Sequence, residues 1–252
     1  MSSFATVESG SGADEAPGSK ATLVHNAGVV RARMLQAATE SGRDPASVHL
    51  VAVSKTKPPS DIQALYDAGQ RTFGENYFQE LLEKAAALPE DISWHFIGHL
   101  QSQKAAKLVK DVTNLRVVET VDSLKLAKKL HSACEAAART LQIYIQVDTS
   151  GEDTKSGVPP PEVVALVQAI VAECPSLRVT GLMTIGAPGD LSCFDRLVES
   201  RADVAAALGV DAASLALSMG MSGDYPEAIA RGATSIRVGS TIFGERQYAP
   251  KP

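Results

Sequence analysis

Two kinds of stretch follow each other regularly along the chain. Short runs of mostly apolar residues are typical of buried strands. Each run precedes a longer stretch with apolar residues at helical spacing, often opened by Pro, Ser or Asp and closed near a Gly. The expected strands are residues 48–54, 71–76, 92–98, 115–121, 141–149, 177–186, 214–220 and 235–244.

The expected strands are continuous apolar runs rather than alternating ones, which is the pattern of a parallel sheet covered by helices on both faces. Eight such strand–helix units in about 200 residues predict a single (β/α)8 TIM barrel. A helical pattern over residues 21–42 adds an extra N-terminal helix. A doubly wound sheet is the second choice, but no GxGxxG fingerprint follows the first strand.

Composition is that of an ordinary globular protein. The chain has 252 residues, of which 44% are hydrophobic and 21% charged. Residues 1–20 are rich in Ser, Gly and acids, and we expect a disordered tail there. The remaining residues, 21–252, are expected to form one domain.

Charge and cysteine content exclude several classes of protein. The net charge of −5 argues against nucleic-acid binding, and no apolar run approaches the ~20 residues of a membrane span. Three cysteines outside any CxxC motif indicate reduced thiols. The first residues lack the features of a secretory signal. The expected location is cytoplasmic, with a mitochondrial one left open.

Polar residues collect where the expected strands end, which is where barrels carry their active sites. In chain order these ends are Lys55, Glu75–Asn76, Gly98–His99, Glu119, Asp148, Met183–Thr184, Ser218–Ser222 and Arg237–Ser240. Lys55 follows the first strand directly, so it is either a solvated strand-end charge or an amine that forms a Schiff base with an aldehyde.

The last two strand ends resemble phosphate-binding loops. "SMGMSGD" (218–224) and "RVGSTIFG" (237–244) are rich in small residues, and the second places Gly239 and Ser240 just after the strand. Barrels commonly bind phosphate in the loops after strands seven and eight. Arg237 ends an apolar strand and has a second interpretation as half of a salt bridge in the barrel mouth.

No metal site is expected. His95 and His99 are four residues apart, but they lie on a strand and the following loop, where this spacing does not bring them together. A Schiff-base lysine beside a phosphate site suits two ligands: a sugar phosphate, as in a lysine aldolase, or pyridoxal phosphate. The residues by themselves do not separate these two.

Longer motifs favour the second ligand. "AVSKTKP", "AGQRTFGENYFQE", "WHFIGHLQSQK", "KSGV", "GLMTI", "LSMGMSGDYPEAI" and "RVGSTIFGER" together resemble the pyridoxal phosphate homeostasis protein family, single-domain relatives of the alanine racemase N-terminal barrel. The resemblance covers about residues 25–247. Two positions depart from the expected pattern, Gln103 in place of an asparagine and His99 at a variable place, and both lie outside the lysine and phosphate motifs.

The resemblance implies a cofactor site for pyridoxal 5′-phosphate. Lys55 would hold the cofactor as an internal aldimine, and Arg237 would face the pyridine nitrogen and keep it unprotonated. Ser222, Gly239 and Ser240 match phosphate-binding positions. Asn76 would lie beside the ring, and Met221 beside the phosphate loop.

The family also implies a function. We expect a non-catalytic protein that buffers pyridoxal 5′-phosphate and delivers it, with apo forms of cofactor-dependent enzymes as partners. The alternatives are an amino-acid racemase and a lysine aldolase. A racemase needs a second base, which alanine racemases take from a C-terminal domain, whereas this sequence ends at Pro252. On the same ground a monomer is expected.

Overall fold

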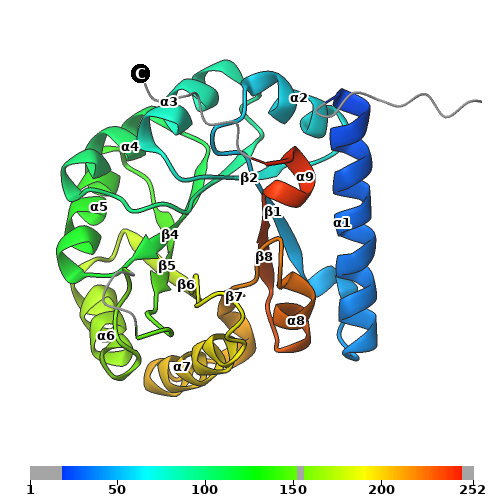
Figure 1. Ribbon diagram of the computed structural model, residues 1–252. Coiled ribbons are helices and arrows are strands. Elements are labelled where there is room, and N and C mark those ends of the chain that lie inside the picture. The colour runs from blue at the N-terminus through cyan, green and yellow to red at the C-terminus, as the bar shows by residue number, and fades with distance from the viewer. Residues whose placement is uncertain (1–18, 152–155, 246–252) are drawn as a thin grey trace, which may run out of the picture.

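Eight parallel strands close into a barrel in the described part of the chain, and their order around the barrel is their order in the sequence (Figure 1). The computed structural model describes residues 19–151 and 156–245. The strands are β1 (His49–Val53), β2 (Thr72–Glu75), β3 (Ser93–Phe96), β4 (Leu115–Val121), β5 (Leu141–Gln146), β6 (Leu177–Met183), β7 (Ala216–Ser218) and β8 (Ser235–Val238).

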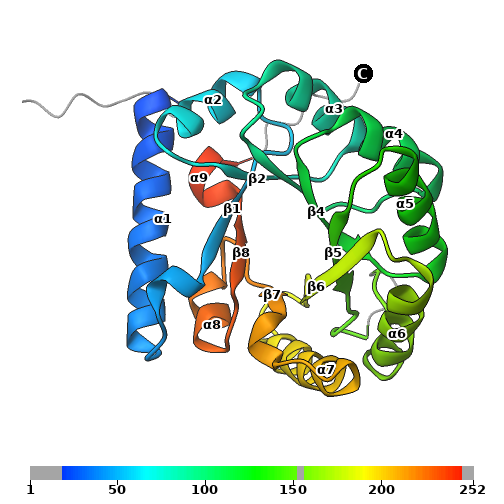
Figure 2. The same ribbon diagram turned by 180° about the vertical axis from the view of Figure 1, so that it is seen from behind.

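Helices surround the barrel, as the front and back views both show (Figures 1 and 2). They are α1 (Lys20–Glu40), α2 (Pro59–Asp67), α3 (Phe78–Ala87), α4 (Ala105–Asp111), α5 (Leu124–Ala136), α6 (Val163–Glu173), α7 (Ser192–Leu208), α8 (Tyr225–Ala230) and α9 (Ser240–Phe243). Short 3-10 turns lie at Pro45–Ser47, Ser102–Lys104, Pro160–Glu162 and Ala212–Ser214. The predicted barrel with its additional N-terminal helix is therefore confirmed.

The closure between β1 and β8 positions the site. His49 pairs with Ser235 and Val51 with Arg237, so the first and last strands lie side by side. The carboxyl ends of parallel strands meet at one end of a barrel. Lys55 and the segment after β8, far apart in the sequence, therefore share the same mouth.

The predicted last strand is too long. Residues 235–244 were expected to be one strand, but β8 ends at Val238 and Ser240–Phe243 form α9. The backbone turns because the amide groups of Ile242 and Phe243 donate to the carbonyl of Gly239. The apolar side chains that suggested a strand are buried instead by the short helix, whose Ile242 carbonyl accepts a hydrogen bond from Asn26 of α1.

The N-terminal helix α1 begins at a defined cap and covers one side of the barrel. The Ser19 hydroxyl accepts a hydrogen bond from the amide of Thr22 at 3.1 Å, which satisfies one of the free donors of the first turn. Its apolar stripe, which includes Leu23 and Val30, is buried. Of the predicted disordered tail, residues 1–20, positions 1–18 lie outside the described residues. Ser19 and Lys20 belong to the start of α1.

None of the helices in the described ranges is long and apolar enough to cross a membrane.

Candidate functional site

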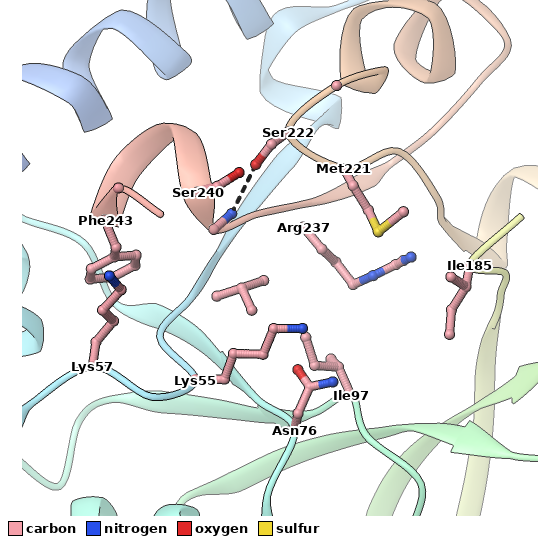
Figure 3. Close-up of a pocket in the computed structure, with 14 residues that line it drawn as sticks. Lys55, Lys57, Asn76, Ile97, Ile185, Met221, Ser222, Arg237, Ser240 and Phe243 are labelled. Carbon is pink, nitrogen blue, oxygen red and sulfur yellow. Dashed lines mark hydrogen bonds between the residues drawn. The ribbon is translucent and has the colours of Figure 1, made fainter. Parts of the chain in front are cut away.

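A pocket of about 300 Å³ opens at the carboxyl ends of the strands (Figure 3). This volume is at the lower end of the range for small-molecule sites. All seven residues predicted for the cofactor site line it: Lys55, Asn76, Met221, Ser222, Arg237, Gly239 and Ser240. The structure thus brings together residues from opposite ends of the chain, and their role toward a cofactor stays a prediction.

Lys55 enters the pocket from the first strand. β1 ends at Val53, and the half-buried Lys55 side chain extends into the pocket toward Asn76 and Arg237 (Figure 3). Lys57 also lines the pocket, but its ammonium group donates to the carbonyl of Glu245 at 3.0 Å. The Lys55 side chain points toward Asn76 and Arg237, whereas the Lys57 side chain lies beside Phe243, so Lys55 is the better candidate for imine chemistry (Figure 3).

Asn76 is held by a close backbone contact. A Cβ atom on Gly98 would lie 2.0 Å from the Asn76 carbonyl oxygen, so only glycine fits at this position after β3. The Asn76 side-chain oxygen is buried and has no hydrogen-bond partner in the described structure. An unsatisfied polar atom beside a pocket is consistent with a ligand that supplies the missing donor.

Arg237 is a buried charge held at two points. The residue is 5% exposed. Its Nη1 donates to the hydroxyl oxygen of Ser218 at 2.6 Å, and its Nη2 donates to the carbonyl of Thr184 at 2.7 Å. Burial lowers the pKa of Arg237, while the negative charges of Glu119 and Asp224 oppose this shift.

A chain of hydrogen bonds continues from Arg237 through the barrel interior. The Ser218 hydroxyl lies 2.5 Å from Oε2 of Glu119, and Oε1 of Glu119 lies 2.5 Å from Nδ1 of His95. Burial disfavours ionisation of Glu119, but the hydrogen bond and charge of His95, the charge of Arg237 and the Ser218 bond outweigh it. The pKa of Glu119 is therefore lowered. The second interpretation of Arg237, a salt bridge in the barrel mouth, is met indirectly, since Arg237 is joined to Glu119 through the Ser218 hydroxyl.

Small residues form the opposite wall. The Ser222 hydroxyl accepts a hydrogen bond from the amide of Gly239 at 3.3 Å (Figure 3). It accepts a second one from the amide of Thr241 at 3.4 Å. A Cβ atom on Gly239 would lie 3.2 Å from the Val53 carbonyl oxygen, closer than ordinary contact. This wall therefore presents the hydroxyl groups of Ser222 and Ser240, which can donate hydrogen bonds to phosphate oxygens.

In the described ranges His95 and His99 do not come together as a pair of metal ligands would. His95 bonds to Glu119 inside the barrel, whereas His99 is exposed. No group of three or more His, Cys, Asp or Glu side chains gathers there in a way that could hold a metal ion.

One charged residue next to the site, Lys84, does not stand out in the sequence. Lys84 of α3 reads as an ordinary solvated helix lysine, but it is only 4% exposed and donates to Glu75 and to the carbonyl of Ser54. Its spacing from Glu80, one helical turn earlier, was the available signal, although such pairs are usually at the surface.

Comparison with known proteins agrees with the fold. A family model for the alanine racemase N-terminal domain matches residues 22–247. Alanine racemase from Corynebacterium glutamicum superimposes with a TM-score of 0.66, covering 94% of this chain and 64% of the racemase. The two are 18% identical, so this likeness shows the fold alone. The protein has the barrel fold of the alanine racemase N-terminal domain.

Two further matches are more specific. The mouse (Mus musculus) pyridoxal phosphate homeostasis protein is 49% identical over 239 residues, which cover 88% of this chain and 86% of the mouse chain. PipY of Synechococcus elongatus, solved with pyridoxal phosphate bound, is 33% identical with a TM-score of 0.74, covering 88% of this chain and 100% of PipY. The chain belongs to the pyridoxal phosphate homeostasis protein family, which confirms the resemblance seen in its motifs.

Proposed function

We propose that this protein binds pyridoxal 5′-phosphate as a Schiff base on Lys55 and acts in its storage and delivery. One observation carries the proposal. A primary amine, Lys55, and a wall of phosphate-type donors, Ser222 with Ser240, line the same small pocket, with Arg237 beside them (Figure 3). The structure of PipY with pyridoxal phosphate bound supports the choice of ligand.

The residues fit this ligand by size and chemistry. Bound pyridoxal 5′-phosphate supplies an aldehyde that condenses with an amine and a phosphate dianion. The amine of Lys55 attacks the aldehyde carbon, a C=N bond replaces the C=O bond, and water leaves. Ser222, Gly239 and Ser240 bind the phosphate. Arg237, which only donates hydrogen bonds, faces the ring nitrogen and keeps it unprotonated.

The composition of the pocket favours storage over racemisation. Racemisation of an amino acid by two bases needs a second proton acceptor on the face opposite the lysine. Among the described residues that line the pocket, the titratable ones are Lys55, Lys57 and Arg237. Lys57 is bonded to a backbone carbonyl, and Arg237 does not give up its proton. The pocket rim is also open to solvent, since Ile185 is 42% exposed and Met221 36% exposed. An open rim suits binding and release of a ligand better than proton abstraction, which needs water to be excluded.

All seven predicted residues belong to one chain, so the site does not require a second copy. We infer that the protein can act as a monomer and that the apo forms of enzymes using the same cofactor receive it. Release by water is the reverse reaction, in which water attacks the imine carbon, the aldehyde forms again and the Lys55 amine is regenerated. An incoming amine that attacks the same carbon also frees Lys55, and the cofactor then leaves as an imine of that amine.

The test is a visible spectrum of the protein with pyridoxal 5′-phosphate, before and after borohydride reduction. We expect an imine absorption band that reduction fixes onto the peptide containing Lys55. Lys55→Ala should lose the band, whereas Lys57→Ala, which changes the other lysine of the pocket, should keep it.

Two results would overturn the proposal. Absence of the band after addition of pyridoxal 5′-phosphate would remove the cofactor assignment and favour an aldolase with a sugar phosphate substrate. Amino-acid racemisation by the loaded protein at rates typical of enzymes, about 1 per second or faster, would make it a racemase rather than a store.

A further inference from the structure

A cluster of buried charges lies directly behind the Lys55 segment. Lys84 of α3 donates to Oε1 of Glu75 at 2.7 Å, to Oε2 of Glu80 at 2.9 Å and to the carbonyl of Ser54 at 2.9 Å. The side chain of Lys84 is 6% exposed and that of Glu75 is fully buried. One ammonium group thus joins three segments: the end of β1, the end of β2 and the first turns of α3.

The cluster contacts the residues on both sides of Lys55. On one side, the Ser54 carbonyl accepts from Lys84, and the Ser54 hydroxyl donates to Glu75 at 2.7 Å. On the other side, the amide of Thr56 donates to Oε2 of Glu80 at 2.8 Å. The backbone that carries Lys55 is therefore attached to the cluster immediately before and immediately after the lysine.

The backbone at Thr56 is in an unfavourable conformation. Its φ angle is +63°, in the left-handed region that a β-branched residue rarely adopts. Strain of this kind persists only where surrounding contacts enforce it. The Thr56–Glu80 hydrogen bond is one such contact, and Lys84 holds the same carboxylate oxygen.

The ammonium group of Lys84 also compensates the negative charge of the buried Glu75 carboxylate. Burial raises the pKa of Glu75, and Lys84 opposes this rise through its charge and hydrogen bond. Glu75 directly precedes Asn76, which lines the cofactor pocket. Loss of Lys84 would leave the buried Glu75 without its positive partner, and breaking such a pair is strongly destabilising.

We propose that Lys84, with Glu75 and Glu80, is a positioning residue that holds the Lys55 segment in the geometry for Schiff-base formation. It acts through the backbone at Ser54 and Thr56 and does not contact the phosphate-type wall formed by Ser222 and Ser240. The inference rests on the proposed function of Lys55. It predicts that the cluster serves the imine linkage and leaves recognition of the phosphate group intact.

The experiment separates these two parts of binding with two ligands. Pyridoxal 5′-phosphate forms an imine, whereas pyridoxine 5′-phosphate has an alcohol in place of the aldehyde and binds only through ring and phosphate contacts. We expect Lys84→Met to weaken apparent affinity for the aldehyde by at least about tenfold, equivalent to about 1.4 kcal/mol. Affinity for the alcohol should change by less than about threefold. Glu80→Gln should show the same pattern more weakly and serves if Lys84→Met does not fold.

A second measurement needs no ligand. In the apo protein, amide hydrogen exchange at Thr56 should accelerate by at least about tenfold in Lys84→Met or Glu80→Gln, because the hydrogen bond to Glu80 weakens. Lys107→Met is the matched control. It removes a lysine from another i,i+4 ion pair, with Asp111 on α4, and should change neither measurement.

Equal loss of affinity for both ligands would show a merely structural role, and unchanged affinity for the aldehyde would also overturn the proposal. Unchanged Thr56 exchange in both variants would do the same. If wild-type protein formed no imine, the proposed function would fail, while the exchange measurement would still decide whether Lys84 holds this segment.

Discussion

Glu119 and Arg237 are joined through the hydroxyl group of Ser218, which lies 2.5 Å from Oε2 of the carboxylate and 2.6 Å from Nη1 of the guanidinium. A guanidinium only donates hydrogen bonds, so the Ser218 oxygen accepts from Arg237 and its own proton goes to Glu119. The serine therefore transmits the orientation of the carboxylate to the arginine. Three strands, β4, β7 and β8, contribute one residue each.

This arrangement predicts that substitutions of Glu119 and Ser218 affect the free energy of unfolding in a coupled way. Ser218→Ala removes one hydrogen-bond partner from each charged group, while Glu119 keeps its bond to His95 and Arg237 keeps its bond to the Thr184 carbonyl. We expect the free energy of unfolding to fall by about 1–3 kcal/mol. Combined with Glu119→Gln, the two losses should be non-additive by about 1 kcal/mol or more. Urea unfolding followed by the fluorescence of Trp94, the single tryptophan and a fully buried one, measures these values.

Thr120→Val is the control for this pair of substitutions, Ser218→Ala and Glu119→Gln. The Thr120 hydroxyl donates to the Gly98 carbonyl at the end of the neighbouring strand, whereas the Ser218 hydroxyl bonds to Glu119 and Arg237. Its effect should add to that of Ser218→Ala within about 0.5 kcal/mol. Additivity of Glu119→Gln with Ser218→Ala to the same degree would show that the serine does not link the two charges.

The lowered pKa of Glu119 makes part of the stability dependent on pH. A carboxyl group whose pKa is lower in the folded chain than in the unfolded chain stabilises the fold above its unfolded pKa. This contribution is lost as the pH falls through the folded pKa. The stability difference between wild type and Glu119→Gln should therefore shrink between about pH 5 and about pH 3. A difference that stays constant over this range in urea unfolding would contradict the assignment.

A Gly→Ala substitution should have opposite effects on the free energy of unfolding at Gly98 and at Gly28. Gly98→Ala would place a methyl group 2.0 Å from the Asn76 carbonyl oxygen and must displace Asn76 or β3. We expect a loss of about 2 kcal/mol or more in the free energy of unfolding. Gly28 is exposed within α1, where an added Cβ meets nothing within 4 Å, so Gly28→Ala should stabilise by up to about 1 kcal/mol. Equal effects at the two sites would be incompatible with the close contact at Asn76.

The three cysteines should react slowly with thiol reagents in the native state. Cys134, Cys174 and Cys193 are all buried free thiols. Burial raises the pKa of Cys134 to about 11, so little thiolate exists near neutral pH. Labelling with a disulfide reagent at about pH 8 should be at least about a hundredfold slower than in denaturant, because the thiolate is the reacting form. Immediate reaction of all three native thiols would contradict this burial.

Most of the barrel was predictable because it follows from local order, whereas the seven cofactor-site candidates were taken as a set from the family resemblance and their role stays a prediction. Continuous apolar runs between helical stretches indicate a parallel sheet, and the residue after each run lies at the functional end. Lys55 and Gly239 were placed in this way, and the structure puts both in one pocket. The predicted end of the last strand was wrong because a short, mostly apolar run such as residues 241–243 suits a strand and a buried short helix equally well.

The supporting charges could not be predicted, since they depend on partners that lie on other strands of the barrel. Lys84 looks solvated until Ser54 and Glu75 are brought behind it by the pairing of β1 with β2. The partnership of His95 with Glu119 likewise depends on the β3–β4 register. The sequence by itself determined the order of elements and which residues end the strands, because hydrophobic periodicity and strand ends are local. Only the tertiary structure decided which buried charges neutralise each other, because closure of the barrel sets those distances.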